Sequence, residues 1–181
     1  LGYGRNFVIL DAEDQQAVIK DCLKRLGLSD RQFQPGAVLG TISGAKNAML
    51  DPRQFAARAG DYWRQQVAKV YTLYQDQLRS NNALDFDDLL LKAVELLERF
   101  DDIREHYQRK FEFILVDEYQ DTNHVQNRWV FLLAGEKQNL AVVGDDDQGI
   151  YSWRGADISN ILEFEAQFPR CRSIKLEQNY R

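Results

Sequence analysis

The sequence predicts an α/β protein in which a parallel sheet is joined to a helical part. Across residues 1–100, apolar side chains recur mostly at helical spacing. Across residues 101–181, short apolar runs alternate with helical segments. This alternation is typical of parallel sheets, because a parallel crossover needs a connection about as long as a helix. We therefore divide the chain near residue 100 into a helical part and an α/β part.

Capping residues mark the ends of the first helices. Asp11 is a candidate N-cap for a helix that ends near Gly27, and Asp85 is a candidate N-cap for a later helix. Pro52 suits the first turn of a short helix, where its missing N–H is not needed. The helices expected before residue 110 cover approximately residues 12–26, 38–49, 52–59, 61–79, 86–97 and 101–109.

An aromatic stripe runs along residues 61–79, where Tyr62, Trp63, Tyr71 and Tyr74 fall close to helical spacing. We interpret the stripe as core packing between helices, because aromatic side chains bury large apolar surfaces. Stacking on nucleic-acid bases is the weaker alternative.

Three strands are expected in the α/β part, at residues 113–116, 140–143 and 173–176, with helices near 122–134 and 157–168. The first run is short, bulky and β-branched, which is typical of a strand that is covered on both faces.

Polar residues follow each expected strand. Asp117, Glu118, Gln120 and Asp121 follow the first, residues 145–148 the second and residues 178–181 the third. Because parallel strands bring their carboxyl ends to one edge, we expect the three clusters to converge. Adjacent carboxylates suit Mg²⁺ carried by nucleotide phosphates, although acids at a helix N-terminus are the alternative. A metal ligand, a carboxylate base, an amide and a guanidinium would together fit phosphoryl transfer to water.

Aromatic residues stand beside a cation in Tyr151, Trp153 and Arg154. Bases stack on exposed aromatic rings whatever their identity, with about 1–3 kcal/mol per base, and Arg154 could pair with a backbone phosphate. Tyr151 and Trp153 could equally be core residues with a polar end.

Composition excludes several classes of protein. The net charge of −5 over 181 residues argues against a globally basic nucleic-acid binder. Residues 1–100 are balanced, so residues 101–181 carry the whole excess, and any nucleic-acid contact must be local. No apolar run reaches membrane-spanning length, so no membrane contact is expected. Cys22 and Cys171 lack metal-ligand spacing, which predicts free thiols in a reducing, cytoplasmic compartment.

Long stretches of the chain resemble the superfamily-one DNA helicases of the UvrD/Rep/PcrA type. Three segments resemble successive motifs of that family in order and spacing, namely Val116–Asn123, Val143–Ala156 and Leu176–Arg181. Asp85–Leu89 resembles a further family element, and Leu1–Leu28 with Ile42–Asn47 resembles the helical 1B subdomain. The resemblance covers essentially the whole chain.

The resemblance implies roles in ATP hydrolysis for five residues. Asp117 would hold Mg²⁺, and Glu118 would be the base that activates water. Gln148 would sense the γ-phosphate. Tyr180 would lie against the adenine, and Arg181 would be the arginine finger.

The same resemblance places Tyr151 and Trp153 against single-stranded bases, with Arg154 nearby on the DNA path. It implies ATP and Mg²⁺ as cofactors, and single-stranded DNA and junctions of single- and double-stranded DNA as partners, with repair or replication proteins as further candidates. Gly149 departs from the family, which often has Ser after the Gln, so a hydroxyl contact there is in doubt.

The implied fold is a partial RecA-like (P-loop NTPase) sheet with an inserted helical subdomain. Residues 1–100 would form the 1B-like subdomain and residues 101–181 the C-terminal part of motor domain 1A. No Gly-x-x-x-x-Gly-Lys-Ser/Thr sequence, which cradles phosphates, occurs in these residues. We therefore expect a piece of a longer protein that lacks the phosphate loop and the second motor domain, and that is inactive alone.

Three other functions are weighed against the helicase. A non-catalytic nucleic-acid-binding or partner-docking module would not need Asp117, Glu118, Gln148 and Arg181 intact. A helicase-nuclease subunit stays open within the family, although the compact helical insertion favours a simpler helicase. A metal-dependent nuclease or phosphatase should place acids and metal-binding His on several elements.

Overall fold

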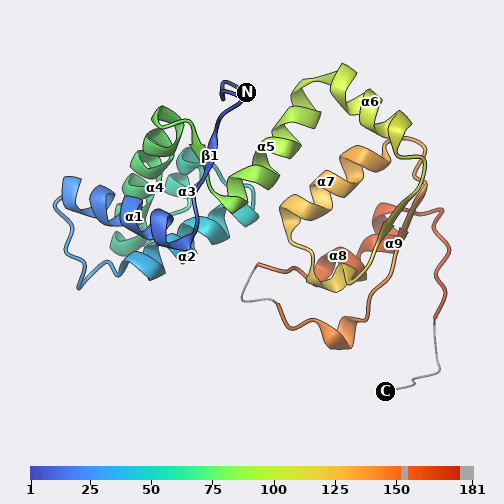
Figure 1. Ribbon diagram of the computed structural model, residues 1–181. Coiled ribbons are helices and arrows are strands. Elements are labelled where there is room, and N and C mark those ends of the chain that lie inside the picture. The colour runs from blue at the N-terminus through green and yellow to red at the C-terminus, as the bar shows by residue number, and fades with distance from the viewer. Residues whose placement is uncertain (152–154, 176–181) are drawn as a thin grey trace.

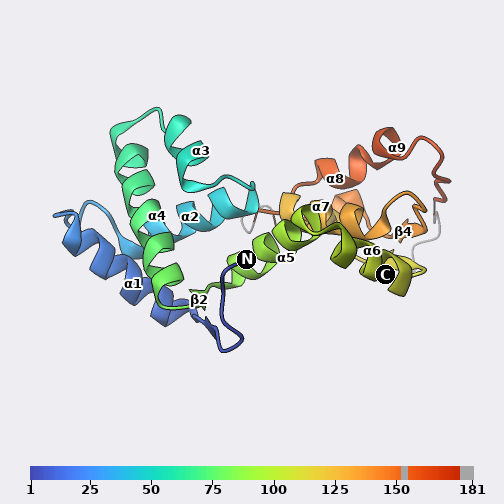
Figure 2. The same ribbon diagram turned by 90° about the horizontal axis from the view of Figure 1, so that it is seen from above.

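The computed structural model describes residues 1–151 and 155–175. Within them the protein is mostly helical with two small parallel sheets. Figures 1 and 2 show a group of helices from the first half of the chain on one side, the α/β part on the other, and helix α5 (Phe86–Arg99) between them.

The helical group packs around one hydrophobic core. Its buried members include Ile19, Phe33, Val67 and Tyr74. The helical group also contains a two-stranded parallel sheet, in which Val8 pairs with Ala83 and Ile9 with Leu84. The elements of this group are β1 (Val8–Ile9), α1 (Ala12–Arg25), α2 (Pro35–Asn47), α3 (Pro52–Ala57), α4 (Tyr62–Ser80) and β2 (Ala83–Leu84).

Side-chain caps begin α1 and α5, as the sequence predicts. The Asp11 carboxylate accepts from the backbone N–H groups of Glu13 and Asp14 at 2.9 Å, so it stabilises the start of α1. Asp85 forms a capping box with Asp88 at the start of α5.

The aromatic stripe on α4 is core except for Tyr62, which confirms the interpretation as packing for the other rings. Tyr71 and Tyr74 are buried, and Trp63 stacks on Phe33 with the ring centroids 6.3 Å apart. Tyr62, at the first turn, is exposed.

The α/β part contains helices α6 (Asp101–Lys110) and α7 (His124–Ala134). Helix α7 packs against α5. Its sheet contains two parallel strands, β3 (Ile114–Val116) and β4 (Leu140–Val142), with Ile114 opposite Leu140. The first two expected strands are therefore confirmed, each one residue shorter than predicted.

The third expected strand is not formed in its described residues, because residues 173–175 have no regular structure. Leu176 lies outside the described residues. The helix expected at 157–168 is replaced by two single turns, α8 (Ser159–Leu162) and α9 (Phe164–Gln167), separated at Glu163.

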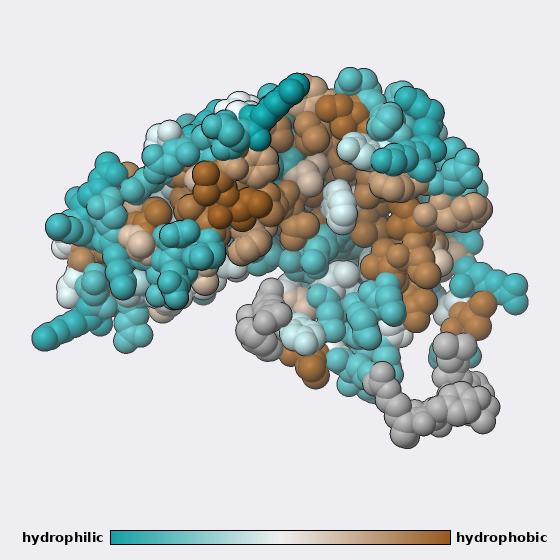
Figure 3. Space-filling view, in the orientation of Figure 1, coloured by the Kyte–Doolittle hydropathy of each residue, from teal (hydrophilic) through white to brown (hydrophobic). Residues whose placement is uncertain are grey.

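The expectation that β3 is covered on both faces is wrong for the described residues. Phe113 is 81% exposed and Leu115 is 71% exposed, whereas the intervening Ile114 is half-buried. Successive side chains point to opposite faces of a strand. The described helices therefore cover one face of this sheet only. Figure 3 shows hydrophobic side chains at the surface of the α/β part as well as of the helical part.

No helix in the described part of the chain is both long and apolar enough to cross a membrane.

Candidate functional site

The carboxyl ends of β3 and β4 lie side by side. Backbone pairing continues past the strands, since Val143 N donates to Val116 O (2.8 Å) and Tyr119 N donates to Val143 O (3.0 Å). Asp117 and Glu118 therefore leave the sheet next to the turn that begins at Asp145. The predicted convergence of the first two polar clusters is confirmed by this geometry.

Gln120 joins the two clusters directly. Its side-chain N–H donates to Glu118 Oε2 (2.7 Å), and its Oε1 accepts from the backbone N–H of Asp145 (3.1 Å). Gly144 permits this approach, because a Cβ at Gly144 would lie 2.4 Å from Gln120 Oε1. The sequence places Gln120 among the polar residues of the first cluster but does not indicate this bridging role.

Glu118 has a left-handed backbone, with φ of +51°. This conformation costs a non-glycine residue about 1–3 kcal/mol and is concentrated at functional sites. The Asp117 carboxylate accepts from the Glu118 N–H (2.9 Å), and both acidic side chains are exposed. The turn therefore presents two adjacent carboxylates to the surrounding solvent.

A buried polar network holds the turn η1 (Tyr119–Asp121) that follows these acids. The Tyr119 hydroxyl donates to Asn127 on α7, Asn127 donates to Asn160 (2.9 Å), and Asn160 donates to Thr122 O (2.9 Å). Burial raises the pKa of Tyr119 to about 12, so its hydroxyl remains a donor at neutral pH. Buried hydrogen bonds therefore hold the segment that directly follows Asp117 and Glu118.

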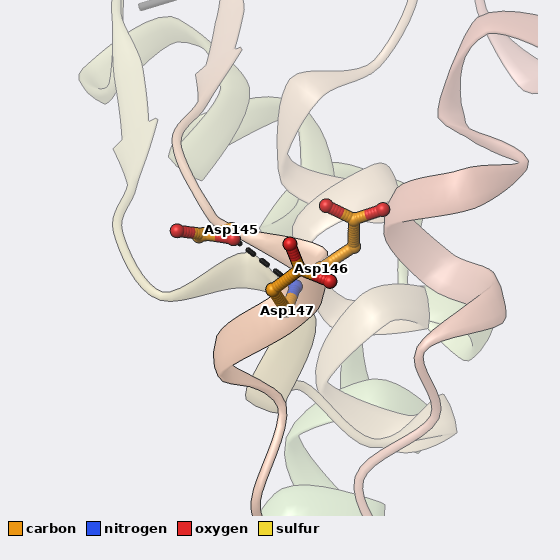
Figure 4. A group of neighbouring side chains, drawn as sticks. All are labelled: Asp145, Asp146 and Asp147. Atoms are coloured by element: carbon orange, nitrogen blue, oxygen red, sulfur yellow. Dashed lines mark hydrogen bonds between the residues drawn. The ribbon is translucent and has the colours of Figure 1, made fainter. Parts of the chain in front are cut away.

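The second cluster forms the turn η2 (Asp146–Gln148), with Asp145 as its cap. Asp145 Oδ1 accepts from Asp147 N (3.0 Å), and its Oδ2 accepts from Gln148 Nε2 (2.6 Å). Figure 4 shows Asp145, Asp146 and Asp147 close together, and ligand oxygens of the three lie within 4.8 Å of one another. All three are exposed, and exposed acidic groups of this kind are common without an ion.

The remaining predicted site residues are only partly described. Tyr151 is exposed and follows η2, as a nucleic-acid contact requires. Trp153, Arg154, Tyr180 and Arg181 lie outside the described residues. The structure thus brings together Asp117, Glu118 and Gln148 but does not test the positions of the third cluster.

A comparison with known protein families matches residues 1–169 to the UvrD/REP helicase N-terminal domain. The chain belongs to this family. The resemblance to UvrD/Rep/PcrA-type helicases is thereby confirmed.

Curated relatives of this UvrD/REP helicase chain are named ATP-dependent DNA helicase PcrA. The protein of that name from Bacillus subtilis (strain 168) is 52% identical over all 181 residues, which span 24% of that relative. The one from Staphylococcus aureus (strain Mu50) is 51% identical over the same residues, which span 25% of it. The chain therefore covers about a quarter of the length of the curated relatives that it matches.

Proposed function

We propose that this chain is part of an ATP-dependent DNA helicase and contributes one wall of its ATP site and part of its path for single-stranded DNA. The observation that carries the proposal is the meeting of Asp117, Glu118 and the Asp145–Gln148 turn at one sheet edge. Ligands of open α/β sheets bind at that edge. The family membership and the names of the relatives support the same reading.

The donor set at this edge fits Mg²⁺, which prefers one or two carboxylates together with phosphate oxygens and water. Asp117 would hold the ion, because its exposed carboxylate stands at the end of β3. When bound, the ion supplies neutralisation of the phosphate charge.

The protein's own residues would then orient and deprotonate the attacking water. Glu118 is the proposed base, and the hydrogen bond from Gln120 fixes the direction of its carboxylate. Gln148 is the proposed γ-phosphate sensor on the neighbouring turn. Tyr180 and Arg181 are proposed to contact the adenine and the transferred phosphate.

We also propose the finer fold assignment, in which residues 1–100 are a helical 1B-like subdomain and residues 101–181 are part of a RecA-like motor domain. Tyr151, Trp153 and Arg154 would contact single-stranded DNA, with DNA junctions and repair or replication proteins as partners of the whole helicase. Because these 181 residues contain no phosphate-cradling loop, the chain alone should not hydrolyse ATP.

The test is Glu118→Gln in a complete helicase in which this chain forms the corresponding segment. The substitution keeps the shape of the side chain and removes the base, so ATP binding should persist while kcat falls by about 100-fold or more. Glu136→Gln, at an exposed site beyond α7, is the matched control and should keep normal turnover. Turnover by Glu118→Gln within a few-fold of wild type would refute the assigned base.

The Asp145–Asp147 cluster raises one rival function, a metal-dependent nuclease. That function predicts DNA cleavage by the 181-residue chain with Mg²⁺ or Mn²⁺ and no nucleotide. The helicase proposal predicts no cleavage under these conditions.

A further inference from the structure

Asn47, at the last position of α2, contacts the segment that follows the candidate catalytic acids. Its Oδ1 accepts from the side-chain N–H of Asn123 at 2.6 Å, although 76 residues separate the two in the chain. Asn123 is the N-cap of α7, and only Thr122 separates it from the η1 turn. The side chain of Asn47 thus links the helical part to the segment that follows Asp117 and Glu118.

The same side chain also lies close to the segment that follows the candidate DNA-binding residues. Gly155 has φ of +83°, and a Cβ at Gly155 would lie 3.3 Å from the Asn47 Cβ. Next to Gly155, Ala156 forms an antiparallel bridge with Asn123, and Asp157 N donates to Thr122 O (2.9 Å). The stretches after both candidate motifs therefore form one unit. Asn47 is hydrogen-bonded to Asn123 in one stretch and lies close to Gly155 in the other.

Asn47 is anchored firmly on its other side. Its amide donates to Ser43 O (2.9 Å) and lies 3.4 Å from Asp87 Oδ1 at the start of α5. The preceding residue, Lys46, is fully buried between Asp85 and Asp88. A displacement of α2 would therefore be transmitted through Asn47 rather than absorbed by its side chain.

The surroundings of this contact are open. A cleft of about 370 Å³ lies beside it, lined by Gly44, Asn47, Ala48, Arg58, His124, Gly155 and Asp157. The hydrogen bond between Asn47 and Asn123 is partly buried and lies at the edge of this cleft.

We propose that Asn47 is a positioning residue. It couples the helical part to the segment that follows Asp117 and Glu118 and to the segment that follows the candidate DNA-binding residues 151–154. Through this coupling, binding of DNA at residues 151–154 affects Glu118. This inference rests on the proposed helicase function. It assigns no catalytic contact to Asn47, which acts through Asn123 and Gly155.

The first test measures hydrogen exchange in the 181-residue chain. Asn47→Ala should speed exchange of the Ala156 and Asp157 amides by about fivefold or more, because both amides belong to the unit that Asn47 holds. Amides of α1 should keep their exchange rates. Thr41→Ala is the matched control, since its hydroxyl donates to Ala37 O within α2 itself. Unchanged exchange at Ala156 and Asp157, or faster exchange throughout the chain, would overturn the positioning role.

The second test is a double-mutant cycle in the complete helicase, with Asn47→Ala and Asn123→Ser. Serine keeps the N-cap of α7 and removes the amide donor, so the shared bond alone is deleted. Each single variant should lower DNA-stimulated kcat by about three- to tenfold, from the net value of one hydrogen bond. The double variant should be no worse than Asn47→Ala alone, and turnover without DNA should fall by less than DNA-stimulated turnover.

Additive losses, or equal losses with and without DNA, would show a merely structural role and refute the coupling. A wild-type helicase whose ATP turnover did not respond to DNA would instead refute the proposed function. The hydrogen-exchange result would still decide whether Asn47 holds the two segments together.

Discussion

Lys46 is a buried cation at the junction between α2, α4 and α5. Its ammonium is fully buried and lies 2.6 Å from Asp85 Oδ2 and 2.8 Å from Asp88 Oδ1. The Tyr74 hydroxyl donates to Asp85 Oδ2 at 2.9 Å, and Gln75 donates to Asp88. Burial raises the pKa of Asp88, and the Lys46 ammonium opposes that rise. The charges of this cluster are thus tolerated in the interior only as a set.

Lys46→Met should destabilise the chain strongly, because it leaves two buried carboxylates without their cation. The expected loss is about 3–5 kcal/mol in the free energy of unfolding, measured by urea denaturation at neutral pH. Lys20→Met, on the exposed side of α1, is the control and should change stability by less than about 0.5 kcal/mol. Equal stability of the two variants would contradict the importance of the cluster.

At the scale of elements, Ala156, which follows the candidate DNA-binding residues, is held by two backbone contacts. Ala156 N donates to Tyr151 O (3.2 Å), and Ala156 also pairs with Asn123. Exposed Tyr151 therefore belongs to a stretch that starts at the carboxyl edge of the sheet and returns to the start of α7. This arrangement supports the proposal that binding of DNA near Tyr151 affects the acids.

Trp153→Ala in the complete helicase should weaken binding to single-stranded DNA by about 1–3 kcal/mol, the value of one base stacked on an aromatic ring. Fluorescence anisotropy with a labelled oligonucleotide measures this loss, and ATP affinity should change little. Trp129→Ala, which removes a comparably large ring from an exposed site on α7, should leave DNA affinity intact. If Trp153→Ala binds DNA as tightly as wild type, the stacking role is wrong.

At the scale of the whole molecule, the helical part and the α/β part differ in how completely their apolar side chains are buried. The helical group surrounds a continuous core that includes Cys22, Val38 and Leu78. In the described residues of the α/β part, the sheet has two strands, and one of its faces exposes Phe113 and Leu115. Stability is therefore expected to be uneven along the chain.

Hydrogen exchange followed by mass spectrometry should show this difference in the 181-residue chain. Peptides from α1 and α4 should exchange slowest, and peptides from β3 and β4 should exchange faster, because their strands are short and open to solvent on one face. Uniform protection of both parts would mean that the chain unfolds as a single cooperative unit.

Local signals in the sequence were sufficient for most of the elements. Caps such as Asp11 and Asp85 act within one helical turn, so neighbouring residues predict them. The same holds for the helical spacing of Tyr71 and Tyr74 and for the two apolar runs of the sheet. The burial of β3 was predicted wrongly, because an apolar run does not reveal whether a partner covers each face.

The sequence by itself determined the family, the helical part, two parallel strands and the acids that end them, because each is encoded in contiguous residues. Only the tertiary structure decided that Gln120 connects Glu118 to Asp145, and that Asn47 reaches Asn123 and Gly155. Those contacts join residues far apart in the chain, and a polar side chain takes its partner from whatever the packing of the helices brings within hydrogen-bond distance.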